Sequence, residues 1–566
     1  MRQLLGAAIV LLAVCPAATA GDDSPVLTVM QKELDRSWTA LARVEHAKQI
    51  PLYYLDYEVV DNDEAILYSV LGALDTESLS SNRSLDVDVR VGSPGLDNTH
   101  EMKGRESWSE HRQYHLVRLP LEKDADALRA ALWLETDAAY KTALERYIQV
   151  QANRAVTAQE EDPSPDFSKE GSAVHFSKTR RAQGLDRELW RAKLKKYSAR
   201  FKEHPFIYRS GAFLSAKTEN RYFISSEGAR IAQGRGYIRL AYQLATRTAD
   251  GMELSRFVSY DADRMEDLPS DEKVLKDLES SVGELQVLKD APLVEPFAGP
   301  VILKNRAAAV FFHEIFGHRV EGQRQKRERE GQTFTKKLNL PVVSDFISVY
   351  DDPTMESFRG TFLRGAYAYD DEGIKSRRVA LVENGILHNF LLNRVPIRGF
   401  PRSNGHGRRE PGYATVARMG NTLVEASKTV PYEELRRMLK AEILRQKKPF
   451  GLLFDDISGG FTTTGRDGVQ AFKVQPLLVY KVYADDRPDE AVRGVDIVGT
   501  PIAGFMKILA AADDPAIFNG SCGAESGFVP VSAISPSLLI SEMEVEKVAK
   551  SQSQPPILPP PYGGKD

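Results

Sequence analysis

The sequence is organised around one short segment, Val310-Phe311-Phe312-His313-Glu314-Ile315-Phe316-Gly317-His318. An alanine-rich apolar run precedes it, so the sequence predicts a helix near Arg306–Phe316. His313 and His318 carry imidazole nitrogens, which suit zinc among the biological metals. Glu314 follows the first histidine, the place that a general base takes in zinc-binding helices of this kind. The segment therefore predicts a metal site with a carboxylate base beside it.

The spacing of the two histidines predicts an irregular helix. His318 is the fifth residue after His313, one more than in the common motif. On a regular helix, residues i and i+4 lie about 40° apart, whereas i and i+5 lie about 140° apart. Two side chains that far apart cannot share a metal ion, so the helix must widen locally or end near Gly317, which permits both.

Coincidence is the alternative explanation of this segment. The chain has 10 histidines, and a His-Glu-x-x-x-His match arises by chance in roughly one chain in a hundred of this size. On this segment alone, a buried apolar helix with two hydrogen-bonded histidines stays an alternative.

A zinc ion needs a further protein ligand besides two histidines. The candidates are the other histidines, any carboxylate, and Cys522, which has glycines on both sides in Asn519-Gly520-Ser521-Cys522-Gly523-Ala524-Glu525. Its thiolate would complete a His-His-Cys site and leave the fourth position to water, whose pKa such an ion lowers to about 7. Composition alone favours a simpler role, a buried inert cysteine, and also allows a reactive thiol.

The first residues indicate export. Arg2, the apolar run Leu4–Val14 and the small-residue site Ala18-Thr19-Ala20 predict a signal peptide over residues 1–20 and a periplasmic or secreted bacterial protein. An uncleaved anchor is the alternative, although the run is short, and Val14 argues against lipidation at Cys15. After cleavage Cys522 would be the single thiol, so no internal disulfide is expected.

Length and charge set further limits. The chain has 566 residues, too many for one ordinary core, so we expect two domains. A formal net charge of -4, from 75 basic and 79 acidic side chains, gives no electrostatic case for a nucleic-acid partner. No later stretch is apolar enough to span a membrane.

Apolar periodicity predicts the secondary structure. In the first half it predicts helices at Val26–Ala47, Asp124–Val156, Leu189–Phe201 and Asp271–Lys289. It predicts strands at Leu52–Val60, Ala65–Leu71 and along the alternating Leu85, Val87, Val89 and Val91, then a meander over Arg221–Arg247 with turns at Gly228 and Gly236. In the second half it predicts short strands, with helices near Arg306–Phe316 and Tyr432–Arg445.

Composition shifts divide the chain. Ala291-Pro292 and Pro296–Pro300 are typical of a linker. We therefore expect an α+β protein with an α/β N-terminal domain over residues 25–292 and a β-rich C-terminal domain over residues 297–549. Residues 550–566 are proline-rich and are expected to be disordered.

Five ordered blocks occupy most of residues 301–545. They are His313-Glu314-Ile315-Phe316-Gly317-His318-Arg319-Val320-Glu321-Gly322; Tyr369-Asp370-Asp371-Glu372-Gly373; Val379-Ala380-Leu381-Val382-Glu383-Asn384-Gly385-Ile386-Leu387; Gly405-His406-Gly407-Arg408-Arg409-Glu410 with Arg418-Met419 and Asn421-Thr422; and Ser521-Cys522-Gly523 with Val529-Pro530-Val531. Together they resemble the TldD/PmbA family of zinc peptidases, also called modulators of gyrase. The first half resembles the family only in its order of elements.

The resemblance implies a function as well as a fold. It implies zinc ligands at His313, His318 and Cys522, with Glu314 as base, in a β-rich C-terminal domain. It also implies dimers that enclose the active site, either homodimers or heterodimers with a paralogue that lacks the motif. Two departures concern Gln323, where many TldD sequences carry Asp, and Pro411-Gly412, which lengthen the loop before Tyr413.

Other polar runs have weaker claims. His406, Arg409 and Tyr413 lie in or beside a glycine-rich loop and are candidates to bind substrate or stabilise an oxyanion. The alternative is that the arginines, Arg408 included, only fix the loop through carboxylates. Asp370–Glu372 is expected to be a solvated turn, and Arg324–Glu330 a solvated helix face or mobile flap.

These observations favour a zinc-dependent peptidase that hydrolyses extended or unfolded peptides through a water activated by Glu314. The alternative is a non-catalytic peptide-binding subunit or scaffold with a structural zinc. A hydrolase of another amide, such as a cell-wall peptide, is a third hypothesis that the sequence cannot separate from the first.

Overall fold

The computed structural model describes residues 24–44, 49–103, 115–122, 124–156, 161–177, 185–327, 330, 332–462, 464–465, 472–499, 504–548 and 554–562. The expected signal peptide and Cys15 lie outside these residues. None of the helices in the described part is long and apolar enough to cross a membrane.

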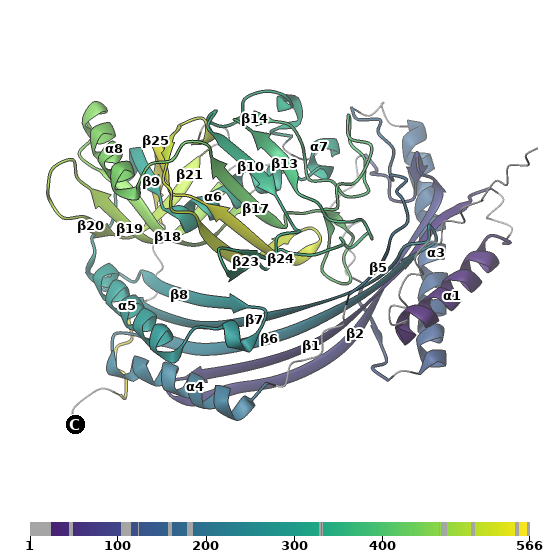
Figure 1. Ribbon diagram of the computed structural model, residues 1–566, viewed down its shortest axis with the longest axis horizontal. Helices are drawn as coiled ribbons and strands as arrows, with labels where there is room; N and C mark the ends of the chain where they lie inside the picture. The colour runs from purple at the N-terminus through teal and green to yellow at the C-terminus, as the bar shows by residue number, and fades with distance from the viewer. Residues whose placement is uncertain are drawn as a thin grey trace, which may run out of the picture.

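The N-terminal half is one long, curved sheet with helices on its outer face (Figure 1); its strands are antiparallel except β5, which pairs with β7 in parallel. Its strand order is β3-β2-β1-β6-β7-β5, with β4 beside β2 and β8 beside β7. The strands are β1 Leu52–Val70, β2 Ala73–Ser93, β3 Leu96–Asp97, β4 Val117–Leu119, β5 Val174–Phe176, β6 Arg209–Ser225, β7 Arg230–Arg247 and β8 Glu253–Ala262. The helices are α1 Pro25–Leu41, α3 Ala125–Val156, α4 Arg187–Ala199 and α5 Asp271–Asp290, with short 3-10 turns at Arg200–Glu203 and Met265–Asp267.

Successive side chains of β1 point to opposite faces of this sheet, and each face packs against a different part of the molecule. Leu55, Tyr57 and Val59 pack in the core beneath α1 and α3. The residues between them, Asp56 and Glu58, point to the opposite face, because successive side chains of a strand alternate. That face is covered by the C-terminal half, which lies in the hollow of the curved sheet (Figure 1).

The C-terminal half contains two sheets with a helix between them. Their strand orders are β14-β13-β10-β17-β24-β23 and β18-β9-β25-β21-β19-β20, with β22 beside β25. The first sheet holds β10 Ile347–Asp351, β13 Val379–Glu383, β14 Ile386–Leu387, β17 Asn421–Ala426, β23 Ala516–Ala524 and β24 Gly527–Ser535. The second holds β9 Phe297–Leu303, β18 Gly451–Thr462, β19 Phe472–Val482, β20 Glu490–Val492, β21 Val495–Gly499, β22 Ile508–Ala511 and β25 Leu538–Lys547.

Helix α6, Asn305–Ile315, lies between these sheets. All its residues from Ala307 to Ile315 are buried, which explains why its sequence is apolar around most of its circumference. Helix α8, Tyr432–Arg445, covers the outer face of the second sheet. The remaining elements are short: the 3-10 turns Gly317–Val320 and Thr335–Lys337, helix α7 Gln323–Lys326, and the strand pairs β11 Ser357–Phe358 with β12 Thr361–Phe362 and β15 Gly407–Arg408 with β16 Val416–Ala417.

The α+β fold class agrees with the expectation, but three local predictions were wrong. Residues 52–70 form one strand, because its polar centre stays paired: Asp61 accepts hydrogen bonds from Arg83 across the β1–β2 ladder. Gly236 lies inside β7, opposite Thr218, and is not a turn, whereas Gly228 does occupy a turn with φ +91°. The expected linker segment Pro296–Pro300 largely belongs to β9.

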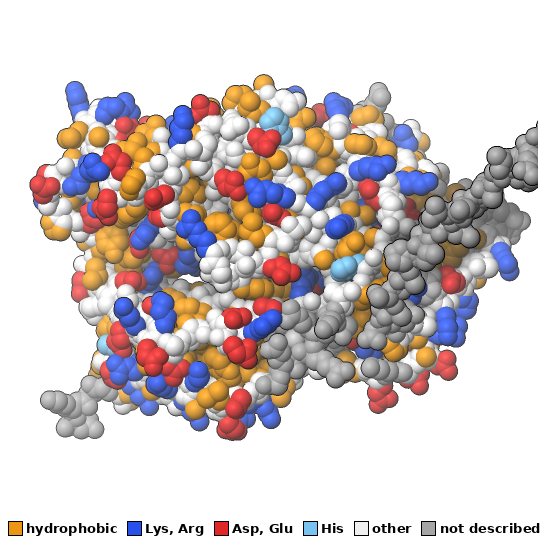
Figure 2. Space-filling model, viewed as in Figure 1, with side chains coloured by type: hydrophobic (Ala, Val, Ile, Leu, Met, Phe, Trp, Pro, Cys, Tyr) orange, Lys and Arg blue, Asp and Glu red, His pale blue; other side chains and the backbone are white. Residues whose placement is uncertain are grey.

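The surface is consistent with the near-balanced charge of the chain. Figure 2 shows acidic and basic side chains interspersed over one face of the molecule, without a broad region of either sign. The described tail residues 554–562 form neither helix nor strand.

Candidate metal centre and active site

The helix that carries His313 ends before it reaches His318. α6 stops at Ile315, and a 3-10 turn over Gly317–Val320 follows, as the five-residue spacing predicts. Gly317 leaves room here for Met419, because a Cβ at this position would lie 2.0 Å from its Sδ and the buried methionine would have to move. The change in helical pitch brings the ring centroids of His313 and His318 to 5.3 Å.

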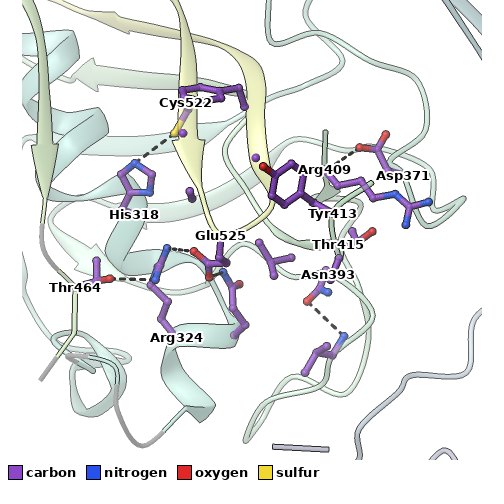
Figure 3. A pocket seen from close by; sticks show the side chains of 18 of the residues that line it. His318, Arg324, Asp371, Asn393, Arg409, Tyr413, Thr415, Thr464, Cys522 and Glu525 are labelled. Atoms are coloured by element: carbon purple, nitrogen blue, oxygen red, sulfur yellow. Dashed lines mark hydrogen bonds and ion pairs between the residues drawn. The ribbon is translucent and has the colours of Figure 1, made fainter. Parts of the chain in front are cut away.

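Cys522 reaches both histidines from a strand of the first C-terminal sheet, whereas the histidines lie on α6 and on the turn that follows it. It lies on β23, and its Sγ is 3.3 Å from Nε2 of His318 (Figure 3). One nitrogen from each histidine and the sulfur lie within 4.8 Å of one another, and all three residues are buried. The structure therefore brings together the three side chains that the sequence nominated as ligands, from segments about two hundred residues apart.

The electrostatics of this cluster favour a thiolate. Burial opposes ionisation of the thiol, but the positive charges of His318, Arg418 and His313 outweigh it and hold the pKa of Cys522 well below its usual range. Burial also disfavours a charged imidazole, yet Cys522 and Glu321 raise the pKa of His318 well above its ordinary value. Both shifts favour a charged pair, a thiolate beside protonated imidazole rings.

The donor set fits zinc. Two imidazoles and a thiolate, with one position open, match the ligand chemistry of catalytic zinc sites. The buried Nδ1 of His313 has no hydrogen-bond partner among the described residues. A buried polar atom of this kind is costly unless another group satisfies it. Among the described residues no other set of histidines, cysteines and carboxylates brings three ligand atoms this close.

Glu321 connects the cluster to a buried ionic network. Its Oε1 lies 3.1 Å from Nδ1 of His318, and its Oε2 accepts a hydrogen bond of 2.8 Å from Nε of Arg324. Arg324 also donates to Glu525, at 2.8 Å from Oε2 (Figure 3). Arg418, fully buried, donates to the carbonyl of Cys522 at 2.5 Å. These hydrogen bonds and ion pairs connect the segment that carries His318 with the segment that carries Cys522.

A cavity of about 1540 Å³ opens onto the cluster. Its walls include His313, Glu314, His318 and Cys522 from the C-terminal half, together with residues of β1 and β2 from the N-terminal sheet. Glu314 is buried to 9% exposure, lines the cavity, and does not belong to the ligand group. Glu314 is therefore placed beside the ligand group and in contact with the cavity.

The glycine-rich loop contributes two of its three nominated residues to the cavity. Tyr413 and Arg409 line it. Arg409 donates to Glu58 of β1 at 3.0 Å, so it joins the two halves of the molecule. His406 was expected near substrate, and this is wrong: it is fully buried, with Nε2 3.1 Å from Asp351 and Nδ1 3.0 Å from Asn404. It fixes the loop from behind the cavity.

Two further expectations need correction. Asp370, Asp371 and Glu372 do not form a solvated turn; all three are buried, and Asp371 pairs with Arg221 at 2.7 Å. The mixed-charge run after Gly322 is not a solvated helix face where it is described, because Arg324 is only 6% exposed. In both cases at least one partner is distant in sequence, Arg221 for Asp371 and Glu525 for Arg324, which a local pattern does not reveal.

The departure at Gln323 also has a structural explanation. Its side-chain oxygen accepts from the backbone N–H of Ala417 at 3.2 Å, and its amide nitrogen lies 3.3 Å from Glu525. An aspartate here could accept but would repel Glu525. The sequence did not predict site roles for Glu321, Arg418 and Glu525. The one local signal was the position of Glu321, three residues after His318, where a carboxylate can contact the histidine ring.

Comparison with known proteins identifies the family. Residues 298–547 match the family model described as PmbA/TldA metallopeptidase C-terminal domain. This region belongs to the TldD/PmbA family. The described residues of the matched region include the whole His-His-Cys cluster and Glu314.

Among its TldD/PmbA relatives is a protein named metalloprotease from Methanocaldococcus jannaschii, 29% identical over 255 residues, or 45% of this chain and 52% of that protein. Another, named zinc metalloprotease TldD homolog, from Saccharolobus solfataricus, is 24% identical over 60% of this chain and 72% of its own length. The chain spans about half the length of the first curated relatives that it matches.

The fold extends over more of the chain than the sequence similarity does. The solved structure of TldE from Thermococcus kodakarensis superposes with a TM-score of 0.57 at 14% identity, over 92% of this chain and 100% of that one. The N-terminal sheet is therefore part of the shared fold.

Proposed function

We propose that this chain is a zinc-dependent peptidase that hydrolyses extended or unfolded peptides, with His313, His318 and Cys522 as metal ligands and Glu314 as general base. The single observation that carries the proposal is the meeting of these three ligand atoms, within 4.8 Å, on the wall of a large cavity that Glu314 also lines.

A zinc ion held there would supply Lewis-acid polarisation of a carbonyl and lower the pKa of water toward neutrality. The work of the chain itself is proton transfer and positioning. Glu314 would take a proton from the attacking water and deliver it to the leaving amine. Glu321 would hold His318 with Nδ1 turned away from the cavity, which leaves Nε2 for the metal.

Strand β23 would hold the substrate. It is the last strand of its sheet and pairs with β24 on one side. Residues Phe518 to Glu525, which include most of this strand, line the cavity. An extended peptide could add to the open edge through backbone hydrogen bonds beside Cys522, which would give low sequence specificity.

The alternative is a peptide-binding subunit or scaffold with a structural zinc. A structural site is closed by four protein ligands. In the part of the chain that the structure describes, three ligand atoms come together, which favours the catalytic proposal. A hydrolase of another amide, such as a cell-wall peptide, would use the same residues.

Export and assembly are also proposals. The N-terminal apolar run supports a periplasmic or secreted protein. The resemblance to the TldD/PmbA family is the basis for proposing a dimer, with a second copy or with a paralogue.

The decisive experiment combines elemental analysis with cleavage of a random peptide pool, comparing the intact protein with Glu314→Gln. We expect stoichiometric zinc in both proteins and cleavage by the intact one alone. A zinc-loaded intact protein that cleaves no peptide would support the scaffold alternative.

A further inference from the structure

The N-terminal sheet places three aspartates, the acidic wall, in the cavity: Asp56, Asp86 and Asp88. In the β1–β2 ladder Asp56 lies opposite Asp88, and Glu58 lies opposite Asp86. Like charges directly opposite one another destabilise a sheet, so each pair needs compensation.

The protein compensates only part of this charge. Arg221 and Arg409 pair with Glu58 at 2.9 and 3.0 Å. Arg90 donates to one oxygen of Asp88 at 2.8 Å, and the Asp88 side chain keeps 30% exposure.

Asp86 and Asp56 form no direct ion pair within the described residues, although both charges act on Arg409, whose pKa they help to raise against the effect of burial. Asp86 is 8% exposed; its Oδ1 accepts from the backbone N–H of Gly412 at 2.9 Å, and its buried Oδ2 has no partner there. Asp56 accepts from the hydroxyl of Tyr54 at 2.8 Å. Burial and the nearby Asp88 raise the pKa of Asp56 to about 8.

The geometry does not suit a metal ion. Within the described residues only His313, His318 and Cys522 bring three ligand atoms within 4.8 Å, so the carboxylates are too far apart to chelate together. An organic cation has several N–H donors and suits separated acceptors better.

The wall and the metal cluster share one cavity. Gly412, which donates to Asp86, precedes Tyr413, which also lines that cavity. Tyr413 and Arg409 reach the cavity from the side opposite His318 (Figure 3).

We propose that the acidic wall is a substrate subsite that binds a cationic nitrogen of the peptide, either a lysine or arginine side chain or the free N-terminal ammonium. The cation would donate to Oδ2 of Asp86 and to the free oxygen of Asp88, and its charge would favour ionisation of Asp56. The subsite rests on the proposed peptidase function and gives it a substrate class: peptides with a positive charge at a fixed distance from the scissile bond.

The test uses a fluorogenic unfolded peptide without charged residues, in which lysine is walked through each position and compared with glutamine. A second pair compares a free with an acetylated N-terminus, which separates the two sources of the cation. With the zinc-loaded full chain we expect one position, or the free terminus, to raise kcat/KM by about tenfold.

Substitutions in the acidic wall test whether it causes the preference for a cationic peptide. Asp86→Asn keeps the size and the Gly412 contact but removes the charge, so the preference should fall to about twofold or less. Asp75→Asn, an exposed position on the same strand β2, should keep it in full. If Asp86→Asn does not fold, Asp88→Asn, at a partly exposed position, carries the same expectation.

Equilibrium binding separates this inference from the peptidase proposal. The lysine and glutamine peptides are titrated against Glu314→Gln by fluorescence anisotropy. Tighter binding of the lysine peptide that depends on Asp86 supports the subsite even if no peptide is cleaved. Equal kcat/KM and equal affinity for all peptide pairs would overturn the subsite proposal. Loss of the preference for the cationic peptide in millimolar Ca²⁺ or Mg²⁺, at constant ionic strength, would also overturn it, because the wall would then be a metal site.

Discussion

Glu321 holds His318 in the orientation that the metal cluster needs: its Oε1 lies 3.1 Å from Nδ1 of that ring, while Nε2 lies 3.3 Å from the sulfur of Cys522. A carboxylate on the far nitrogen fixes both the tautomer and the direction of a ligating imidazole. Glu321 is itself fully buried and held by Arg324, so it has little freedom to move.

Replacing Glu321 by alanine should weaken metal binding without removing a ligand. We expect zinc affinity to fall by about 10- to 100-fold, the usual effect of losing such a partner. Competition with a chromophoric chelator measures it. Glu425→Ala, at an exposed position on β17, is the control and should bind zinc normally. Unchanged affinity in the Glu321 variant would show that the hydrogen bond does not orient the ring.

Glu314→Gln should separate chemistry from binding. The change keeps the side-chain size and the three ligands but removes the base, so turnover of an unfolded peptide should fall by about 100-fold or more. Zinc content and thermal stability should stay near normal. A variant that cleaved as fast as the parent would rule out Glu314 as the base.

His313→Ala and Cys522→Ser should lose the metal itself. Each removes one of three ligands, so zinc content by elemental analysis should fall well below one ion per chain. Tm should fall with it, because the metal stabilises only the folded state. Chelation of the parent should lower Tm similarly, and added zinc should restore it for the parent alone.

Gly317→Ala tests the close approach at the end of α6. The new methyl group would meet Sδ of Met419 at 2.0 Å, so the free energy of unfolding should fall by about 1–3 kcal/mol or more. Gly283→Ala in α5 is the matched control: nothing lies within 4 Å, and alanine is the better helix former, so stability should rise by up to about 1 kcal/mol. Urea denaturation of both variants provides the comparison.

Asp271 offers a test of stability against pH. Although burial opposes its charge, hydrogen bonds from Tyr197, Lys196 and Lys193 lower its pKa to about 2. A folded-state pKa below the unfolded one adds stability that is complete above the unfolded value and is lost as the pH falls toward about 2. Asp271→Asn should therefore lower unfolding free energy by about 1–2 kcal/mol at pH 7. The difference should narrow below pH 4; a constant difference would contradict the assignment.

The sequence predicted most helices and the break between His313 and His318, for physical reasons. The helix Tyr432–Arg445 and the break before His318 follow from local periodicity and from the geometry of a 3.6-residue turn. Cys522 was found through its glycine neighbours and the family pattern, not through any contact visible in the sequence.

The features that were missed depend on pairing across the fold. Asp371 looked solvated because its partner, Arg221, lies in the other half of the chain. Residues Asp61 to Glu64 looked like a break because the strand that pairs with them was unknown. His406 was expected near substrate because it lies in a glycine-rich loop, but it is buried and hydrogen-bonded to Asp351.

The long sequence separation between His318 and Cys522 has a consequence for the stability of a molecule that loses its metal ion. They are 204 residues apart, so an ion bound to both would act as a reversible cross-link that closes a very long loop. By the chain-entropy model, a covalent link of that length restricts the unfolded chain by about 5 kcal/mol. Loss of the ion would therefore lower the stability of the C-terminal half and remove its chemistry together, so an inactive molecule would unfold, and be degraded, more readily than an active one.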